Sequence, residues 1–362
     1  MPLGLLRYGL NGKYPAKRHF RWATEPKKSY DVVIIGGGGH GLACAFYLAR
    51  DWGINNVAVI EKGYLAGGNT ARNTAIIRSN YLTPEGVQFY EHSMKLYQEL
   101  SNTFDYNILY SERGHFTLAH TDAALRTSRW RAEVNKHLGV DSELIYPDDI
   151  ARLCPSMNLS ENVRYPILGA LYHPPGAIAR HDAVAWGYAR RASDWGVDIL
   201  QDTEVTAINQ SGGRVTGVET TRGTIHCGKA MQAVAGSSSL ISKMAGFKLP
   251  IRTIPLQACV SLPVKPFLDQ IVVSGSLHVY VSQSSRGELV MGALLLGQDP
   301  GFKPGAALVI KLVDVAKVVV AAVILALLQR GDGRLLAEHA RAALDQAGEG
   351  APHARTGARA AP

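Results

Sequence analysis

A glycine run near the N-terminus has the composition and spacing of a backbone site for a phosphate-containing ligand. Residues 36–41 read GGGGHG, so that Gly36, Gly38 and Gly41 fit the pattern G-x-G-x-x-G. The first glycine permits a tight turn, the second lets the backbone approach a pyrophosphate, and the third lets a helix pack closely against a sheet. Free N–H groups at the start of that helix would face the negative charge, so the site needs no lysine.

A carboxylate stands at the distance along the chain that this pattern requires. Glu61 follows Gly41 by twenty residues. At the end of a second strand, such a carboxylate can accept hydrogen bonds from both ribose hydroxyls of an adenosine, and it would repel a 2′-phosphate. The glycines and the acid together therefore predict dinucleotide binding.

The elements that must position these groups form a βαβ unit over residues 30–62. Residues 31–35 and 57–60 are short apolar runs, typical of buried parallel strands. Leu42, Ala45, Phe46 and Ala49 recur between them at helical spacing. A glycine-rich turn without a ligand is the alternative, but the register of strand, helix, strand and acid favours a binding site.

The segment after the acid favours a flavin dinucleotide over a nicotinamide one. Residues 63–74, GYLAGGNTARNT, are small and polar, with repeated backbone donors and one arginine. A nicotinamide domain would normally continue directly into another helix, whereas this segment could wrap a long ligand. Composition alone also allows a flexible surface loop.

A second part of the same lobe is expected after residue 180. Residues 183–195 predict a helix, 205–208, 215–218 and 224–227 predict three strands of a meander, and 229–234 predicts a further buried strand. Val205 would lie near an adenine. The residues expected to contact FAD are Gly36, Gly38, Gly39, His40, Gly41, Glu61, Lys62, Asn69, Thr70, Arg72, Asn73, Thr74, Ile77 and Val205.

The predicted fold is α/β, with a Rossmann-type FAD-binding lobe and an interleaved antiparallel-sheet substrate lobe. Alternating strands such as 277–281 and 288–292 belong to the second lobe, and the substrate is expected between the two. The predicted ranges are 1–29 for a basic arm, 30–81 and 166–248 for the FAD-binding lobe, 82–165 and 249–295 for the substrate lobe, and 296–362 for an atypical, partly disordered tail.

Charge and composition exclude several classes of protein. Lys and Arg outnumber Asp and Glu by 38 to 30, and seven basic residues fall within residues 1–29. No nucleic-acid-binding motif accompanies these charges, so we expect no nucleic-acid partner. An extended basic arm is favoured there over a mitochondrial presequence, and no apolar run has the length of a secretory signal.

The cysteines and the longest apolar stretch point to a protein of the reducing cytoplasm. The four cysteines are far apart, without the paired spacing of a disulfide framework or a metal site, so no metal is expected. Residues 308–328 have the length of a membrane span, but three charged residues interrupt them. We therefore expect no membrane segment.

These motifs resemble the FAD-dependent amine and amino-acid oxidases of the D-amino-acid oxidase type. A more particular similarity is to the beta subunits of heterotetrameric sarcosine oxidases. It rests on three segments, LRYGLNGKYPAKRHFRW, GGNTARNTAIIRSNY and LYHPPGAIARHDAVAWGYARRA, within residues 1–293.

The resemblance implies a second flavin. In these proteins the histidine that matches His173 is joined covalently to FMN through the 8α carbon of the flavin, and Arg180 resembles the position that pairs with the FMN phosphate. A neutral imidazole is a suitable nucleophile for such a bond. A forked guanidinium is suited to a phosphate.

The resemblance also implies an activity and partners. FAD would oxidise the N-methyl carbon of sarcosine to give glycine and a one-carbon unit, FMN would receive the electrons, and oxygen would give hydrogen peroxide. The partners would be alpha, gamma and delta subunits. A related amine dehydrogenase, a cyanide-forming oxidase subunit, and an inactive flavin-binding assembly partner are the alternatives. No catalytic side chain is assigned.

The resemblance ends at about residue 294. The remainder is rich in Ala, Arg, Leu and Val and lacks the late glycine-rich segment and lysine expected in the family. We hypothesise a shifted reading frame, with a fusion as the alternative. A family-like continuation in another frame of the gene beyond codon 294 would support the hypothesis, and its absence would remove it.

Overall fold

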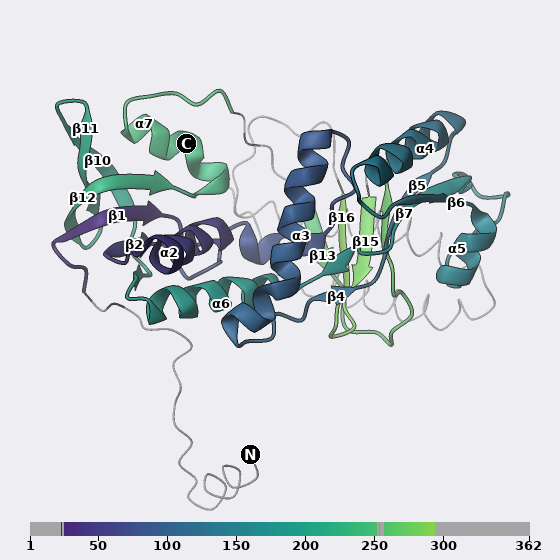
Figure 1. Cartoon of the computed structure of the whole chain (residues 1–362), viewed down its shortest axis with the longest axis horizontal. Coiled ribbons are helices and arrows are strands. Elements are labelled where there is room, and N and C mark those ends of the chain that lie inside the picture. The colour runs from purple at the N-terminus through teal and green to yellow at the C-terminus, as the bar shows by residue number, and fades with distance from the viewer. Residues whose placement is uncertain (1–22, 24, 252, 254–256, 278, 294–362) are drawn as a thin grey trace, which may run out of the picture. The chain divides into compact units, whose positions relative to one another are not determined.

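The computed structural model describes residues 23, 25–251, 253, 257–277 and 279–293 (Figure 1). Most of the predicted basic arm and the whole predicted tail lie outside these residues, as does the apolar stretch 308–328. The hypotheses about the arm and the tail therefore stay predictions. Across the described ranges, no helix has the length and apolarity needed to span a membrane.

The chain divides into two compact units. Of the described residues, those within 1–77, 92–111 and 178–255 form unit 1, and those within 78–91, 112–177 and 256–362 form unit 2. This division differs from the predicted ranges most at two places, and it also assigns residues 78–81 to unit 2 and residues within 249–255 to unit 1. Residues 92–111 group with unit 1 because Leu100, Phe104 and Ile108 pack in its core. Residues 166–177 group with unit 2 because the strand at 169–173 pairs within its sheet.

Unit 1 is built on a six-stranded sheet in the order β10-β11-β12-β1-β2-β9. Its strands are β1 (Ser29–Ile35), β2 (Val57–Ile60), β9 (Asp198–Leu200), β10 (Val205–Ser211), β11 (Arg214–Thr220) and β12 (Gly223–Gln232). The four strands β12, β1, β2 and β9 are parallel, and β10, β11 and β12 form an antiparallel meander. This arrangement confirms the predicted βαβ unit and the meander.

One predicted strand is wrong. Residues 224–227 and 229–234 were expected to form two strands, but β12 runs without a break from Gly223 to Gln232. Gly228 does not interrupt it, because one part of the strand pairs with β11 and an overlapping part pairs with β1. A single long strand therefore joins the meander to the parallel sheet.

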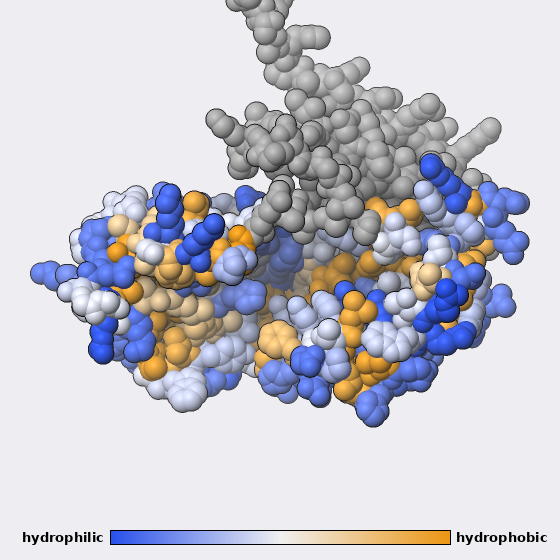
Figure 2. Space-filling view, turned by 90° about the horizontal axis from the view of Figure 1, so that it is seen from above, coloured by the Kyte–Doolittle hydropathy of each residue, from blue (hydrophilic) through white to orange (hydrophobic). Residues whose placement is uncertain are grey.

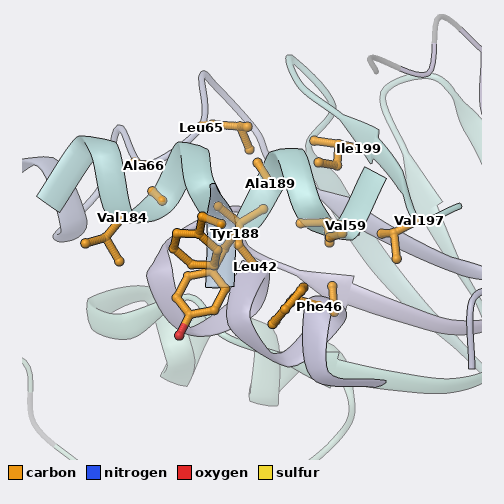
Figure 3. Close-up of a cluster of buried hydrophobic side chains, with 14 of the residues drawn as sticks. Leu42, Phe46, Val59, Leu65, Ala66, Val184, Tyr188, Ala189, Val197 and Ile199 are labelled. Carbon is orange, nitrogen blue, oxygen red and sulfur yellow. The ribbon is translucent and has the colours of Figure 1, made fainter. Parts of the chain in front are cut away.

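Two helices pack together beside this sheet, α2 (Gly39–Trp52) and α6 (His181–Asp194). The positions predicted to face the core from α2, Leu42, Ala45, Phe46 and Ala49, are all buried. Figure 3 shows Phe46 and Tyr188 within the cluster that these helices form with β2 and β9. Gly187 on α6 lets the ring of Phe104 pack against this helix, because a Cβ there would overlap that ring.

Unit 2 contains a seven-stranded sheet in the order β13-β16-β15-β14-β5-β7-β6. Its strands are β5 (His115–Ala119), β6 (Glu143–Ile145), β7 (Gly169–His173), β13 (Gln257–Val260), β14 (Ile271–Ser274), β15 (Val279–Gln283) and β16 (Leu289–Ala293). Only β14 and β5 pair in parallel within it. The helices α4 (Asp122–His137) and α5 (Pro147–Leu153) pack against this sheet.

Short elements lie where the chain passes from one unit to the other. The strands β3 (Ile76–Ile77), β8 (Ala177–Ile178) and β4 (Ser111–Glu112) pair in that order, and α3 (Pro84–Phe104) belongs to both units. The remaining elements are η1 (Thr70–Arg72), η2 (Ala235–Ser237) and α7 (Ser238–Met244). Together with the two sheets they confirm the predicted α/β class.

On the face shown in Figure 2, hydrophobic side chains form small patches between hydrophilic ones. The exposed large hydrophobic residues include Trp52, Phe89 and Leu240. Single apolar residues are common on the surface of folded proteins. Exposure of these side chains alone therefore does not identify a binding surface.

Candidate functional site

The glycine turn of unit 1 has no room for side chains at two of its three pattern positions. Gly36 follows β1 with a φ of +111°, and a Cβ there would overlap the carbonyl oxygen of Ala233. A Cβ at Gly41 would overlap the carbonyl oxygen of Gly36. These two glycines therefore serve the folding of the turn itself.

Gly38 differs, because the protein leaves space beside it. Gly38 caps the N-terminus of α2 in an extended conformation, and a Cβ there would meet only the hydroxyl oxygen of Thr70, at 3.1 Å. The need for glycine at this position is thus not explained by the protein's own packing. Close approach of a ligand phosphate to the protein backbone, as in dinucleotide sites, would explain it.

Backbone N–H groups converge at the same place. The N–H of Gly39 donates to the Thr70 hydroxyl at 2.9 Å. The N–H groups of His40 and Gly41 belong to the first turn of α2, which has no preceding helical carbonyls to bond. The Thr70 oxygen thus occupies a position that an anionic oxygen of a phosphate would favour.

Glu61 follows β2 and braces the turn. Its Oε2 accepts the N–H of Gly37 at 2.8 Å, and its Oε1 accepts the N–H of Gly63 at 3.1 Å. Each carboxylate oxygen keeps a second lone pair, so both could also accept a ribose hydroxyl. The carboxylate therefore links the phosphate-binding turn to the position expected for the ribose.

Replacing Glu61 by Gln tests this assignment. An amide presents one acceptor oxygen and an N–H₂ group, which would face a backbone donor or a ribose hydroxyl. We expect Glu61→Gln to weaken FAD binding by about 10-fold to 100-fold, measured by flavin fluorescence quenching. Glu204→Gln, the same change at an exposed residue of unit 1, should leave the affinity unchanged. Equal affinities of the two variants would contradict the assignment.

The segment after Glu61 returns to the glycine turn. The N–H of Ala66 donates to the carbonyl oxygen of Gly37 at 3.0 Å, and the N–H of Leu65 donates to Oε1 of Gln201 at 2.7 Å. Leu65 and Ala66 are buried. The contact of Gln201 with this segment was not predicted, because no local sequence pattern links the two.

The other predicted FAD residues of this segment lie around η1. Lys62, Asn69, Arg72 and Asn73 are exposed, and Thr74 is partly buried. The side chain of Asn73 bonds the carbonyl oxygen of Thr70 and the N–H of Ala75, both at 2.6 Å. Ile77 packs against the hydrophobic core of unit 1. Contact of these residues with FAD stays a prediction.

Val205 begins β10 and is buried beside Ile35, Ala58 and Ile60. The N–H of Thr203 donates to the main-chain oxygen of Glu61 at 3.0 Å, which brings the start of β10 next to the ribose-facing acid. The structure therefore gathers the glycine turn, Glu61 and Val205 at one end of β1 and β2. The arrangement fits FAD, with backbone donors for the pyrophosphate, an acid for the ribose and an apolar residue for the adenine.

His173 ends β7 in unit 2 and is completely buried. Its Nδ1 lies 2.6 Å from the main-chain oxygen of Asp141, so Nδ1 carries the hydrogen and Nε2 keeps a lone pair. Nε2 lies 3.4 Å from both the N–H and the hydroxyl of Ser79. Burial lowers the pKa of His173 below its usual value, which favours the neutral, nucleophilic imidazole.

The neutral imidazole of His173 suits covalent attachment of a flavin, but a neighbouring side chain lies against its Nε2. Ser79 covers the Nε2 of His173, and the His173 side chain has no exposed surface. Ser79 must therefore move away before a flavin can reach Nε2. The prolines Pro174 and Pro175 lie in a turn in which Gly176 donates to the carbonyl oxygen of His173 at 3.0 Å. That turn fixes the backbone of the attachment residue.

Arg180 caps the N-terminus of α6 in unit 1, whereas His173 belongs to unit 2. The Arg180 guanidinium donates to both carboxylate oxygens of Asp182, from Nε to Oδ1 at 2.9 Å and from Nη2 to Oδ2. This pair lowers the pKa of Asp182 against the opposing effect of burial. A phosphate at Arg180 would compete with that carboxylate, and its role toward FMN stays a prediction.

Arg78 lies in the segment GGNTARNTAIIRSNY, but no local sequence pattern assigns it a role. Arg78 lies in unit 2, and burial lowers the pKa of its guanidinium. Its Nη1 donates to the Oδ1 of Asn80 at 2.9 Å and to the Asn80 main-chain oxygen at 3.3 Å. Its guanidinium lies over the Tyr81 ring, 4.2 Å from the centroid.

Comparison with known proteins identifies relatives across most of the chain. The sequence profile of the FAD dependent oxidoreductase family matches residues 31–349, so the match extends past residue 294, where the resemblance was expected to end. The sarcosine oxidase subunit beta of an Arthrobacter species is 55% identical over 280 residues, which cover 77% of this chain and 69% of that protein. The protein of the same name from Rhizobium meliloti is 49% identical over 300 residues, 82% of this chain and 71% of that protein.

Solved structures show the same fold at low sequence identity. L-proline dehydrogenase from P. horikoshii gives a TM-score of 0.70 at 24% identity, over 82% of this chain and 78% of that one. Glycine oxidase from Geobacillus kaustophilus gives a TM-score of 0.68 at 21% identity, over 80% of this chain and 78% of that one. At these identities the likeness supports the fold alone.

Proposed function

Because the chain belongs to the family of FAD-dependent oxidoreductases that act on CH–NH groups, we propose that it is a flavin-binding subunit that oxidises sarcosine. The observation that carries the proposal is the glycine turn braced by Glu61, in a chain 55% identical to a sarcosine oxidase subunit beta. The name of that relative supports a multi-subunit enzyme. We propose alpha, gamma and delta subunits as the partners.

In the proposed reaction, sarcosine, water and oxygen give glycine, formaldehyde and hydrogen peroxide. Two electrons leave the N-methyl carbon, and FAD and then FMN would carry them to oxygen. The residues of unit 1 would hold FAD, and His173 would be the covalent attachment point of FMN. We propose a location in the reducing cytoplasm. The cysteines among the described residues are all free, which supports it: Cys44, Cys154, Cys227 and Cys259.

Arg78 supplies the cation that a carboxylate-bearing amine needs. Its hydrogen bonds within the described part of the chain end on neutral oxygens of Asn80. A desolvated guanidinium bonded only to neutral groups attracts an anion strongly. We therefore assign the carboxylate of sarcosine to Arg78.

Anaerobic reduction by sarcosine tests the proposal. The FAD-loaded full chain, prepared with its partner subunits, should lose its visible flavin absorption when sarcosine is added without oxygen. Arg78→Met should require at least about 10-fold more sarcosine for the same loss. If no amine bleaches the flavin, the chain is an inactive flavin-binding assembly partner. Bleaching followed by reoxidation with dyes but not oxygen would indicate a dehydrogenase, as named for relatives at 25% identity.

A further inference from the structure

Two arginines of unit 2, Arg78 and Arg131, share one partner residue. Arg131 lies on α4, and its Nη2 donates to the main-chain oxygen of Asn80 at 2.6 Å. Arg78 donates to the same oxygen at 3.3 Å and to the Asn80 side-chain oxygen at 2.9 Å. Asn80 is completely buried. A single buried residue therefore fixes the two guanidinium groups relative to each other.

Aromatic rings hold Arg78 from another side. The ring of Tyr81 packs against its guanidinium, and the ring of Tyr90 stacks on Tyr81 with centroids 3.9 Å apart. Arg78 is thus held by hydrogen bonds to Asn80 and by a stack of two rings. The orientation of the Arg78 guanidinium therefore depends on Asn80, whose main-chain oxygen also accepts a hydrogen bond from Arg131.

Among the described residues, no acid forms an ion pair with either of these two positive charges. Burial, together with the smaller effect of the nearby charge of Arg78, lowers the pKa of Arg131 to about 10. In the described ranges, neither guanidinium forms an ion pair with a carboxylate. Two like charges in a buried region are unfavourable unless an anion joins them.

Within the described ranges, the side chains of Asn80 and Arg131 also carry buried hydrogen-bond donors that have no acceptor. The Nδ2 of Asn80 and the Nε of Arg131 are buried and have no hydrogen-bond partner among the residues described. His115, on β5, is close enough for both arginines to lower its pKa, although burial is the larger cause. A region with two cations, unused donors and a neutral histidine suits an oxyanion better than any other small group.

We propose that Arg131 is a positioning residue for the carboxylate-binding role assigned to Arg78, and this inference rests on that proposed function. Through Asn80, Arg131 fixes the direction of the Arg78 guanidinium, and its own charge strengthens the attraction for an anion. The site therefore selects amines that carry a carboxylate over amines of similar size that lack one.

Arg131→Met tests the proposal in the FAD-loaded holoenzyme. The Kd of acetate, an unreactive monocarboxylate, is measured from the change in the flavin spectrum, together with KM and kcat for sarcosine. We expect the Kd and KM to rise by at least about 10-fold and kcat to change by less than about 3-fold, since a lost ground-state contact acts mainly on KM. The free energy of unfolding should not fall, because the change removes an unbalanced buried charge.

Two further variants separate charge from structure. Arg129→Met, at an exposed residue of the same helix, should leave the acetate Kd unchanged. Arg131→Lys keeps the charge and should restore part of the lost affinity. An unchanged acetate Kd in Arg131→Met would overturn the proposal, and a loss of stability without a change in Kd would show a structural role. If wild type and Arg78→Met bind acetate equally, the assignment of Arg78 fails as well.

Discussion

Gly38→Ala is expected to weaken FAD binding by about 100-fold or more while changing the free energy of unfolding by no more than about 1 kcal/mol. The backbone of Gly38 is extended, in a conformation that alanine adopts readily, and the new methyl group would meet only the Thr70 hydroxyl. The methyl group would, however, keep a pyrophosphate from approaching the backbone. FAD titration of the flavin-free protein and urea denaturation measure the two effects.

Two other glycines serve as references for this variant. Gly275→Ala in unit 2, where a Cβ would have no neighbour within 4 Å, should change neither quantity. Gly36→Ala should reduce both stability and FAD binding, because its φ is +111° and its Cβ would overlap Ala233. Retention of wild-type FAD affinity by Gly38→Ala would show that the ligand does not approach this turn.

His173→Ala is expected to abolish covalently bound flavin and to leave dissociable FAD in place. Only the imidazole Nε2 is proposed to form the bond, and alanine has no nucleophile to replace it. The measurement is flavin absorption in the pellet and the supernatant after acid precipitation of protein produced with its partner subunits. Wild type should show flavin in both fractions, and His173→Ala only in the supernatant.

His137→Ala provides the control for this experiment. His137 is exposed near the end of α4 in the same unit, so its loss should leave the pellet flavin unchanged. Flavin that stays in the pellet of His173→Ala would place the attachment at another residue. A wild-type pellet without flavin would remove the second flavin from the account.

The FAD-binding part of unit 1 was predictable from the sequence because its signals are local. The β-branched runs, the glycines and Glu61 lie within residues 30–62, and the structure brings them together as the pattern requires. The prediction divided β12 into two strands, at 224–227 and 229–234. The continuity of β12 depends on pairing with β11, the strand that precedes it, and with β1, which is distant in the sequence.

The features of unit 2 were less predictable because they depend on tertiary contacts. The sequence marked His173 through a family resemblance, but it gave no sign that Asp141 would set its tautomer or that Ser79 would cover it. Arg131 is one basic residue on a largely polar helix, and only the folded chain shows that it bonds Asn80. No periodicity or spacing rule identifies such a partner in advance.

Titration of the flavin-free full chain with FAD measures whether unit 1 binds this cofactor. We predict saturable binding of one FAD per chain, released again by acid and not displaced by NAD. The glycine turn and Glu61 supply the contacts for this binding. Absence of saturable FAD binding, or displacement of FAD by NAD, would show that unit 1 is not an FAD site.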